Sequence, residues 1–138
     1  MANSGQHESA NIGGAWNGLY FYPGYPEPVS FVALLIDVGT LFSGSMHEHE
    51  GVISEKRILL HATLDGRRNG TSVSFLKTYD GTGGWKHSVG YDGTLNADAT
   101  EIEGRWYVDG ASGRFIMTRA GATEEAELRK ALEPVQVG

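Results

Sequence analysis

The two ends of this chain match each other, and this match limits the folds open to it. The chain begins with the apolar and aromatic run Gly13–Tyr22 and closes with two similar runs, Ile102–Tyr107 and Ser112–Arg119. Both ends read as β-strands, so the first strand can pair with the last and close the sheet on itself. This pattern favours a small β-barrel, in which side chains fill most of the interior and a ligand would bind in the open mouth.

Glycine marks the breaks between eight stretches in which polar and apolar residues alternate. The chain has 20 glycines, and many of them fall between these stretches, as turns between strands require. Asp65-Gly66 and Asn69-Gly70 lie in one such break and are strong hairpin signals. The spacing predicts an all-β fold, an eight-stranded antiparallel up-and-down barrel, and a two-sheet sandwich with longer connections is the alternative. The expected strands are 15–22, 29–38, 40–48, 57–64, 71–79, 86–95, 101–108 and 113–119.

The residues on either side of the barrel are expected to form a tail and a short helix. Residues 1–12 are polar and lack a basic start or an apolar stretch, so we expect a flexible N-terminal tail and no signal peptide or membrane anchor. The barrel domain is expected over residues 13–120. In residues 121–138, Thr123 can cap a helix that has two glutamates in its first turn, which predicts a C-terminal helix and tail.

Composition excludes several classes of protein. The chain has no cysteine, so neither a disulfide framework nor a thiolate metal site is available, and we expect a cytoplasmic protein. Asp and Glu outnumber Lys and Arg by 17 to 11, and the basic residues are scattered. We therefore expect neither nucleic acid nor an anionic membrane as a partner. No phosphate-cradling loop or dinucleotide fingerprint is present, and we expect no cofactor.

Several short motifs, taken in order, resemble the strands of the calycin superfamily, the avidins and lipocalins, and the avidin resemblance is closer over roughly residues 13 to 119. A glycine and a Trp open the first strand, a Gly-x-Phe-x-Gly type pattern lies on the third, and a Trp followed by apolar residues and a Ser-Gly turn lies on the seventh. The matching segments are Gly14-Ala15-Trp16, Gly39–Gly44, Val73–Lys77, His87-Ser88 with Tyr91-Asp92-Gly93, and Arg105–Val108 with Ser112-Gly113.

The resemblance implies roles for particular residues. It places Phe75, Tyr91 and Trp106 at the aromatic box of the avidins, although only one of the three is a Trp here. It makes Asn17 and Tyr22 the nearest candidates for polar ligand contacts. In lipocalins a Trp on the first strand is covered by an Arg from the last strand, and Trp16 with Arg119 or Arg114 resembles that structural pair.

Strand alternation predicts which side chains face the barrel interior. The more apolar and aromatic face of each strand would point inward, with tyrosine and histidine tips among the rings, a mixture expected of a pocket for a flat or amphipathic molecule. The same rings could instead fill a barrel too narrow for a ligand. We therefore expect non-catalytic binding of a small organic ligand at the open end. The candidate ligand-binding residues are Asn17, Tyr20, Tyr22, Phe75, Tyr79, His87, Tyr91 and Trp106.

Two other functions stay open at the level of sequence. His47 and His49 form a His-x-His pattern that suits a divalent metal, with His61 or His87 as a third ligand, whereas Glu48 to Glu50 would otherwise be a solvated strand end. A cofactor-free isomerase or cyclase, of the allene oxide cyclase or dirigent kind, is the enzyme alternative. Two of His87, Asp37, Asp92 and Glu103 within hydrogen-bond reach would favour catalysis.

The second expected strand is apolar on both faces along Phe31–Ile36. Its outer face needs a cover, either the C-terminal helix or another subunit. We therefore expect a homodimer or a higher symmetric homo-oligomer.

Overall fold

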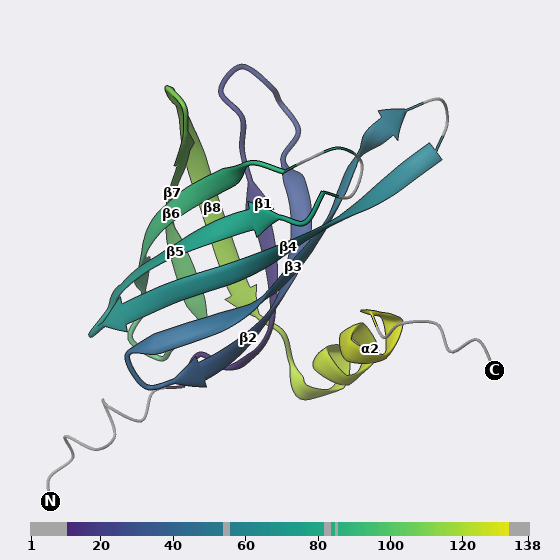
Figure 1. Cartoon of the computed structure of the whole chain (residues 1–138). Coiled ribbons are helices and arrows are strands. Elements are labelled where there is room, and N and C mark those ends of the chain that lie inside the picture. The colour runs from purple at the N-terminus through teal and green to yellow at the C-terminus, as the bar shows by residue number, and fades with distance from the viewer. Residues whose placement is uncertain (1–10, 54–55, 82–83, 85, 133–138) are drawn as a thin grey trace, which may run out of the picture.

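The computed structural model describes residues 11–53, 56–81, 84 and 86–132, and the side chains of residues 49–59 lie outside the described part. Eight antiparallel strands form one closed barrel in which each strand pairs with its neighbours in the chain (Figure 1). The predicted up-and-down barrel is confirmed. The strands are β1 (Gly14–Tyr20), β2 (Val29–Val38), β3 (Leu41–Ile53), β4 (Lys56–Asn69), β5 (Ser72–Tyr79), β6 (Ser88–Leu95), β7 (Glu101–Val108) and β8 (Ala111–Arg119).

The barrel closes where the matching ends of the chain meet. β1 pairs with β8 in an antiparallel register that sets Trp16 opposite Arg119 and Tyr20 opposite Phe115. Because β1 also pairs with β2, the closed sheet has no free edge along its wall. The barrel therefore has two ends. We call the end with the 21–28 loop, the 80–87 loop and the 109–110 turn the mouth, and the opposite end the closed end.

Two strands are longer than the sequence predicts. β3 and β4 pair from Leu41 opposite Arg67 to Ile53 opposite Lys56, and they continue past the barrel wall as a projecting ribbon (Figure 1). The hairpin turn predicted at Asp65-Gly66 is wrong, because both residues lie inside β4 and the chain turns only after Asn69. Gly66 is needed there for packing, because the ring of Phe42 and the Cβ of Phe75 occupy the space that a side chain at this position would need.

Glycines on the inner face bring the wall close to the aromatic core. The ring of Phe31 covers Gly18, the ring of Phe115 reaches Gly93, and Trp106 covers Gly113. A glycine has no side chain, so a strand can bend at this residue. An aromatic ring from another residue then fills the space that a side chain would occupy. These bends let eight strands curl around a narrow interior.

Side chains seal the closed end. The guanidinium of Arg119 lies over the indole of Trp16 at 4.6 Å from the ring centroid, and Trp16 is fully buried. Arg119 also donates hydrogen bonds to the carbonyls of Asn11, Gly13 and Ala99, and its pKa is lowered by burial. Of the two candidate partners for Trp16, the structure selects Arg119, because Arg114 lies over Phe21 instead. This pair locks the first strand to the last.

The predicted C-terminal helix is confirmed as α2 (Ala122–Leu132). Two carboxylates near its start bind β1, since Glu125 accepts a hydrogen bond from the amide of Ala15 and Glu124 accepts one from the side chain of Asn17. Figure 1 shows the helix beside the closed end. Ile36 and Val38 of β2 stay 64% and 68% exposed, so the outer face of this strand is not covered there. Among the described residues, the helix is too short and polar to cross a membrane.

Candidate functional site

A buried network of four polar side chains lies inside the barrel near the mouth. Glu48 of β3 accepts hydrogen bonds from the hydroxyls of Tyr20 and Tyr79, both 2.6 Å from Oε1. Lys77 forms an ion pair with Oε2 of Glu48 at 3.1 Å and donates to the hydroxyl of Tyr79 at 2.8 Å. Its ammonium also lies over the rings of three tyrosines. These are Tyr20, Tyr79 and Tyr91, at 4.8, 4.5 and 5.4 Å from the ring centroids.

Burial of this network carries a large cost in free energy. Glu48 and Lys77 are each only 1% exposed. Removing two charges from water carries a penalty of several kcal/mol per ion before the pair and its hydrogen bonds recover it. Burial, together with the charge of Glu48, raises the pKa values of Tyr20 and Tyr79 far above their ordinary range, so both hydroxyls stay protonated and donate.

Strand alternation explains how Glu48 comes to be inside. Phe42, Gly44, Met46 and Glu48 share one face of β3, and Phe42 and Met46 are apolar residues of the buried core. The prediction that Glu48 is part of a solvated strand end is therefore wrong. The signal was present in the sequence as a period of two that continues for one more residue. Lys77 carries the same signal, since it lies between the buried Phe75 and Tyr79 on β5.

Aromatic residues lie next to the network on the side of the mouth. The half-buried ring of Tyr22 meets Tyr20 at 5.5 Å and Trp106 at 5.3 Å between centroids, both edge to face. The exposed His87 lies at 4.9 Å from the ring of Tyr79. The structure therefore brings five of the predicted ligand residues together near the mouth: two of them bind the carboxylate of Glu48, and the other three pack against those two tyrosines. They are Tyr20, Tyr22, Tyr79, His87 and Trp106.

The middle of the barrel is packed with rings. Phe75 and Tyr91 stack in parallel at 4.6 Å, and Phe115 meets both edge to face. Phe42 packs against Phe75 at 6.0 Å. Of the predicted ligand residues, Phe75 and Tyr91 thus belong to this packed layer, and Tyr91 forms the part of it that faces Lys77.

The remaining predicted polar residues lie away from the mouth. Asn17 is half-buried on the outer side of β1, where it donates to Glu124 of α2. Among the four acid–base candidates, Asp37 contacts Arg68 and the amide of Ile12 near the closed end. Asp92 and Glu103 are exposed, each next in sequence to a glycine of the inner face. No hydrogen bond within the described residues joins any two of these four candidates.

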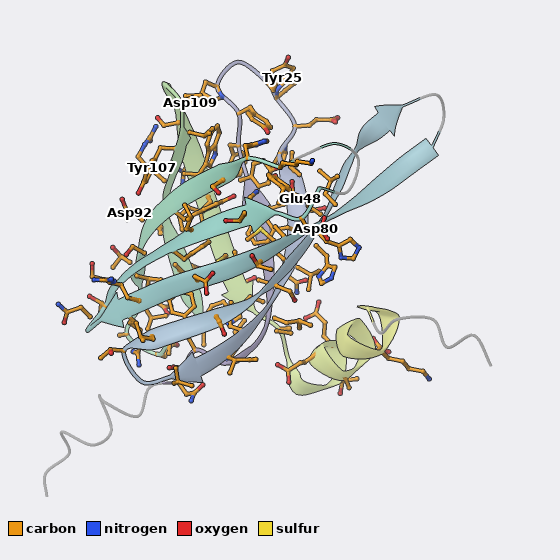
Figure 2. The ribbon with its side chains drawn as sticks, viewed as in Figure 1. Tyr25, Glu48, Asp80, Asp92, Tyr107 and Asp109 are labelled. Carbon is orange, nitrogen blue, oxygen red and sulfur yellow. The ribbon has the colours of Figure 1, made fainter. Side chains whose placement is uncertain are left out.

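A hollow lies on the outer face of the barrel. It measures about 900 Å³ and crosses β3 to β7, where Leu41, Leu76 and Tyr107 supply apolar surface. Asp92 and Asp109 stand at its edge, and Figure 2 shows both of them with Tyr107 along one side of the wall. The tyrosine ring here covers Gly90, which has no side chain to fill the groove. The groove is open to solvent and holds no buried charge like the pair at the mouth.

Two histidines meet on the outer side of the wall at the level of the network. His47 of β3 lies directly opposite His61 of β4, and their ring centroids are 4.5 Å apart. Nδ1 of His47 is buried without a hydrogen-bond partner. The other predicted metal ligand, His49, lies opposite Leu59 in the backbone register, and its side chain is outside the described part. No group of three potential metal ligands occurs among the described side chains.

Comparison with known proteins supports the fold and nothing finer. No family model matches the chain, and no curated protein matches it significantly. Among solved structures, a redesigned beta barrel aligns with a TM-score of 0.59 over 83% of this chain and 96% of that chain, at 11% sequence identity. At such low identity the likeness extends to the architecture alone, and function has to be argued from the site.

Proposed function

We propose that the barrel binds a small amphipathic or aromatic organic molecule at its mouth. The observation that carries the proposal is the Glu48–Lys77 pair, which is buried at the one end of the barrel that Trp16 and Arg119 do not seal. An apolar core would stabilise the barrel at least as well as a buried ion pair does. Polar groups that break a local packing rule occur most often at functional sites.

The surroundings of the pair suit a ring that carries a polar group. The half-buried Tyr22 offers an aromatic edge at the rim, where the buried Trp106 packs against it. The network below offers hydroxyl, ammonium and carboxylate groups. Ligand sites commonly combine apolar walls with a few placed polar groups in this way. Because Phe75, Tyr91 and Phe115 fill the middle of the barrel, the ligand would stay near the mouth.

Binding of a fluorescent amphipathic probe, anilinonaphthalene sulfonate, tests the proposal. The wild type should give a saturable rise in fluorescence, and Tyr22→Ala should weaken binding about tenfold or more, since it removes a rim ring. Tyr107→Ala is the matched control, because this tyrosine lies outside the barrel in the outer groove. If Tyr107→Ala abolishes binding and Tyr22→Ala leaves it intact, the ligand occupies the outer groove and the proposal is wrong.

A second candidate function follows from the kind of groups in the network. Lys77, Tyr79 and Glu48 form a hydrogen-bonded chain of groups that can carry a proton in acid–base catalysis. A cofactor-free isomerase or cyclase, the enzyme alternative, would use this chain on a bound substrate. Proton exchange of an enolisable aromatic ketone, acetophenone, in deuterated water tests it by NMR. Acceleration by the wild type and not by Glu48→Gln would support catalysis, and equal exchange rates would exclude it for this substrate class.

The proposal includes kinship with the calycin barrels, the avidins and lipocalins, and assembly into a symmetric homo-oligomer. The Trp16–Arg119 pair across the barrel closure supports the former. The exposed Ile36 and Val38 on β2 support the latter, because an apolar outer face of this kind is covered in a subunit interface. Sedimentation of the wild type and of Ile36→Lys tests assembly, with Thr94→Lys on the exposed face of β6 as the control. A wild type that sediments as a monomer would contradict it.

A further inference from the structure

His47 and His61 form a cross-strand pair that the proposed ligand site does not use. They occupy directly opposed positions on β3 and β4, and their rings meet nearly at right angles, with an interplanar angle of 81°. Opposed residues on adjacent strands have their Cβ atoms about 5 Å apart, so two imidazoles placed there can reach one point above the sheet. Both strands belong to the closed barrel wall, which holds the two backbones in a fixed register.

One nitrogen of this pair lacks a partner. Nδ1 of His47 is buried and makes no hydrogen bond to any described group. A buried polar atom without a partner costs about 1–3 kcal/mol. A buried imidazole nitrogen is satisfied either by a hydrogen bond or by a metal ion. Because Nδ1 of His47 has no hydrogen-bond partner, it is available as a metal ligand.

The charge state and the neighbourhood favour a cation. A neutral imidazole has a lone pair on one ring nitrogen, and the buried Nδ1 of His47 makes no hydrogen bond that would occupy it. The carboxylate of Asp80 is exposed and acts electrostatically on His47, so a negative charge lies near the pair. The amide of Asp80 donates to the carbonyl of His61 at 3.1 Å, which ties the 80–87 loop to β4 at this point.

We propose that His47 and His61 bind a divalent transition-metal ion on the outer face of the barrel wall. The ligand set differs from the His-x-His pattern of the sequence, because the second imidazole comes from the neighbouring strand. Two imidazoles suit borderline ions such as Cu²⁺, Ni²⁺ and Zn²⁺, with Cu²⁺ bound most tightly, and they do not suit Mg²⁺. Water completes the coordination, since no third described side chain joins the two rings.

Titration of the untagged protein with Cu²⁺, Zn²⁺ and Mg²⁺ at about pH 7.5 tests the proposal by calorimetry and thermal unfolding. Cu²⁺ and Zn²⁺ should bind with one-to-one stoichiometry and raise the unfolding temperature, because an ion that binds only the folded state stabilises it. His47→Gln and His61→Gln should each weaken Cu²⁺ binding about tenfold or more, as loss of a ligand does. His7→Gln, in the N-terminal segment, is the control and should bind as the wild type does.

Two further results decide between this pair and the alternative. If His49→Gln abolishes binding and His61→Gln leaves it unchanged, the ligands are His47 and His49 and the proposal is wrong. Loss in both variants adds a third imidazole to the pair and supports it. Nitrogen NMR of labelled histidine in the wild type gives a readout that needs no variant, and Zn²⁺ should shift the ring signals of His47 and His61. Unchanged ring signals at saturating Zn²⁺ would overturn the proposal.

Discussion

Removing the charge of Lys77 while keeping its length, in Lys77→Met, tests whether the buried network exists for stability or for function. The substitution deletes the ion pair to Glu48 and the hydrogen bond to Tyr79. It leaves Glu48 only 1% exposed without its cation. Breaking a buried pair in this way costs about 3–5 kcal/mol, because an uncompensated charge stays in the interior. That loss is a large part of the 5–15 kcal/mol that typically stabilises a domain.

The informative comparison replaces the whole network with apolar groups of similar shape. In this fourfold variant the two hydroxyls that donate to Glu48 go as well, so no polar atom of the network is left unpaired. Replacement of a complete buried ion pair is often neutral and can stabilise by about 1–4 kcal/mol. We therefore expect the fourfold variant to be at least as stable as the wild type and to lose binding of the amphipathic probe. The substitutions are Tyr20→Phe, Glu48→Leu, Lys77→Met and Tyr79→Phe.

Urea denaturation followed by circular dichroism and Trp fluorescence gives the free energies of unfolding, with the slope as a check that the denatured states are alike. The single variant Lys77→Met should have a much lower free energy of unfolding than the fourfold variant. A fourfold variant that is as unstable as the single one would refute it, because the network would then be needed to hold the barrel together. The proposed ligand site would lose its main support in that case.

Three further predictions concern the buried tyrosines, one glycine of β3 and the arginine at the closed end. Three buried tyrosines have raised pKa values, so the unfolded state releases protons above about pH 10 while the folded state keeps them, and stability should fall by about 1.4 kcal/mol per pH unit for each. Phenolate absorbance of the native protein should therefore correspond to at most three of the six tyrosines, and titration of all six in the native protein near pH 10 would contradict the sign. Gly44→Ala should destabilise by about 1–3 kcal/mol in urea, because the new methyl group meets the backbone carbonyl of Leu34, whereas Gly121→Ala, with open space around it, should not. Arg119→Met should cost about 2–3 kcal/mol through lost hydrogen bonds and the contact with Trp16, and an equal loss in the exposed Arg114→Met would argue against that assignment. The three tyrosines are Tyr20, Tyr79 and Tyr91.

Sequence was sufficient for the barrel because each strand carries a period of two that tertiary contacts respect. The inward faces predicted for β1, β5 and β7 are the buried ones, as the residues Trp16, Phe75 and Trp106 show. Sequence was insufficient for the boundary of β4, since Asp65-Gly66 has the composition of a turn. Packing determines this boundary, because the ring of Phe42 on β3 and the Cβ of Phe75 on β5 occupy the space beside Gly66.

The candidate site was partly predictable for a different reason. Residue type and strand alternation were enough to predict that Tyr22 and the buried Trp106 lie near the mouth. Glu48 was missed because a charged residue in a run of titratable groups is usually solvated, and only its partners on other strands reverse that expectation. The pairing of His47 with His61 depends on the register between β3 and β4, and this register cannot be predicted from the sequence of either strand alone.

Alternation on one strand also predicts that the two proposed sites act independently. His47 and Glu48 are neighbours on β3, yet one side chain points out of the barrel wall and the other into it. Tyr79 and Asp80 divide in the same way at the end of β5, because Tyr79 is buried in the network whereas Asp80 is exposed and acts electrostatically on His47. We therefore expect Glu48→Gln to change probe binding and leave Cu²⁺ affinity within about twofold of wild type, as independent sites do. His61→Gln should show the reverse. Equal effects of both variants on both ligands, at unchanged stability, would mean that the wall transmits a change in one site to the other.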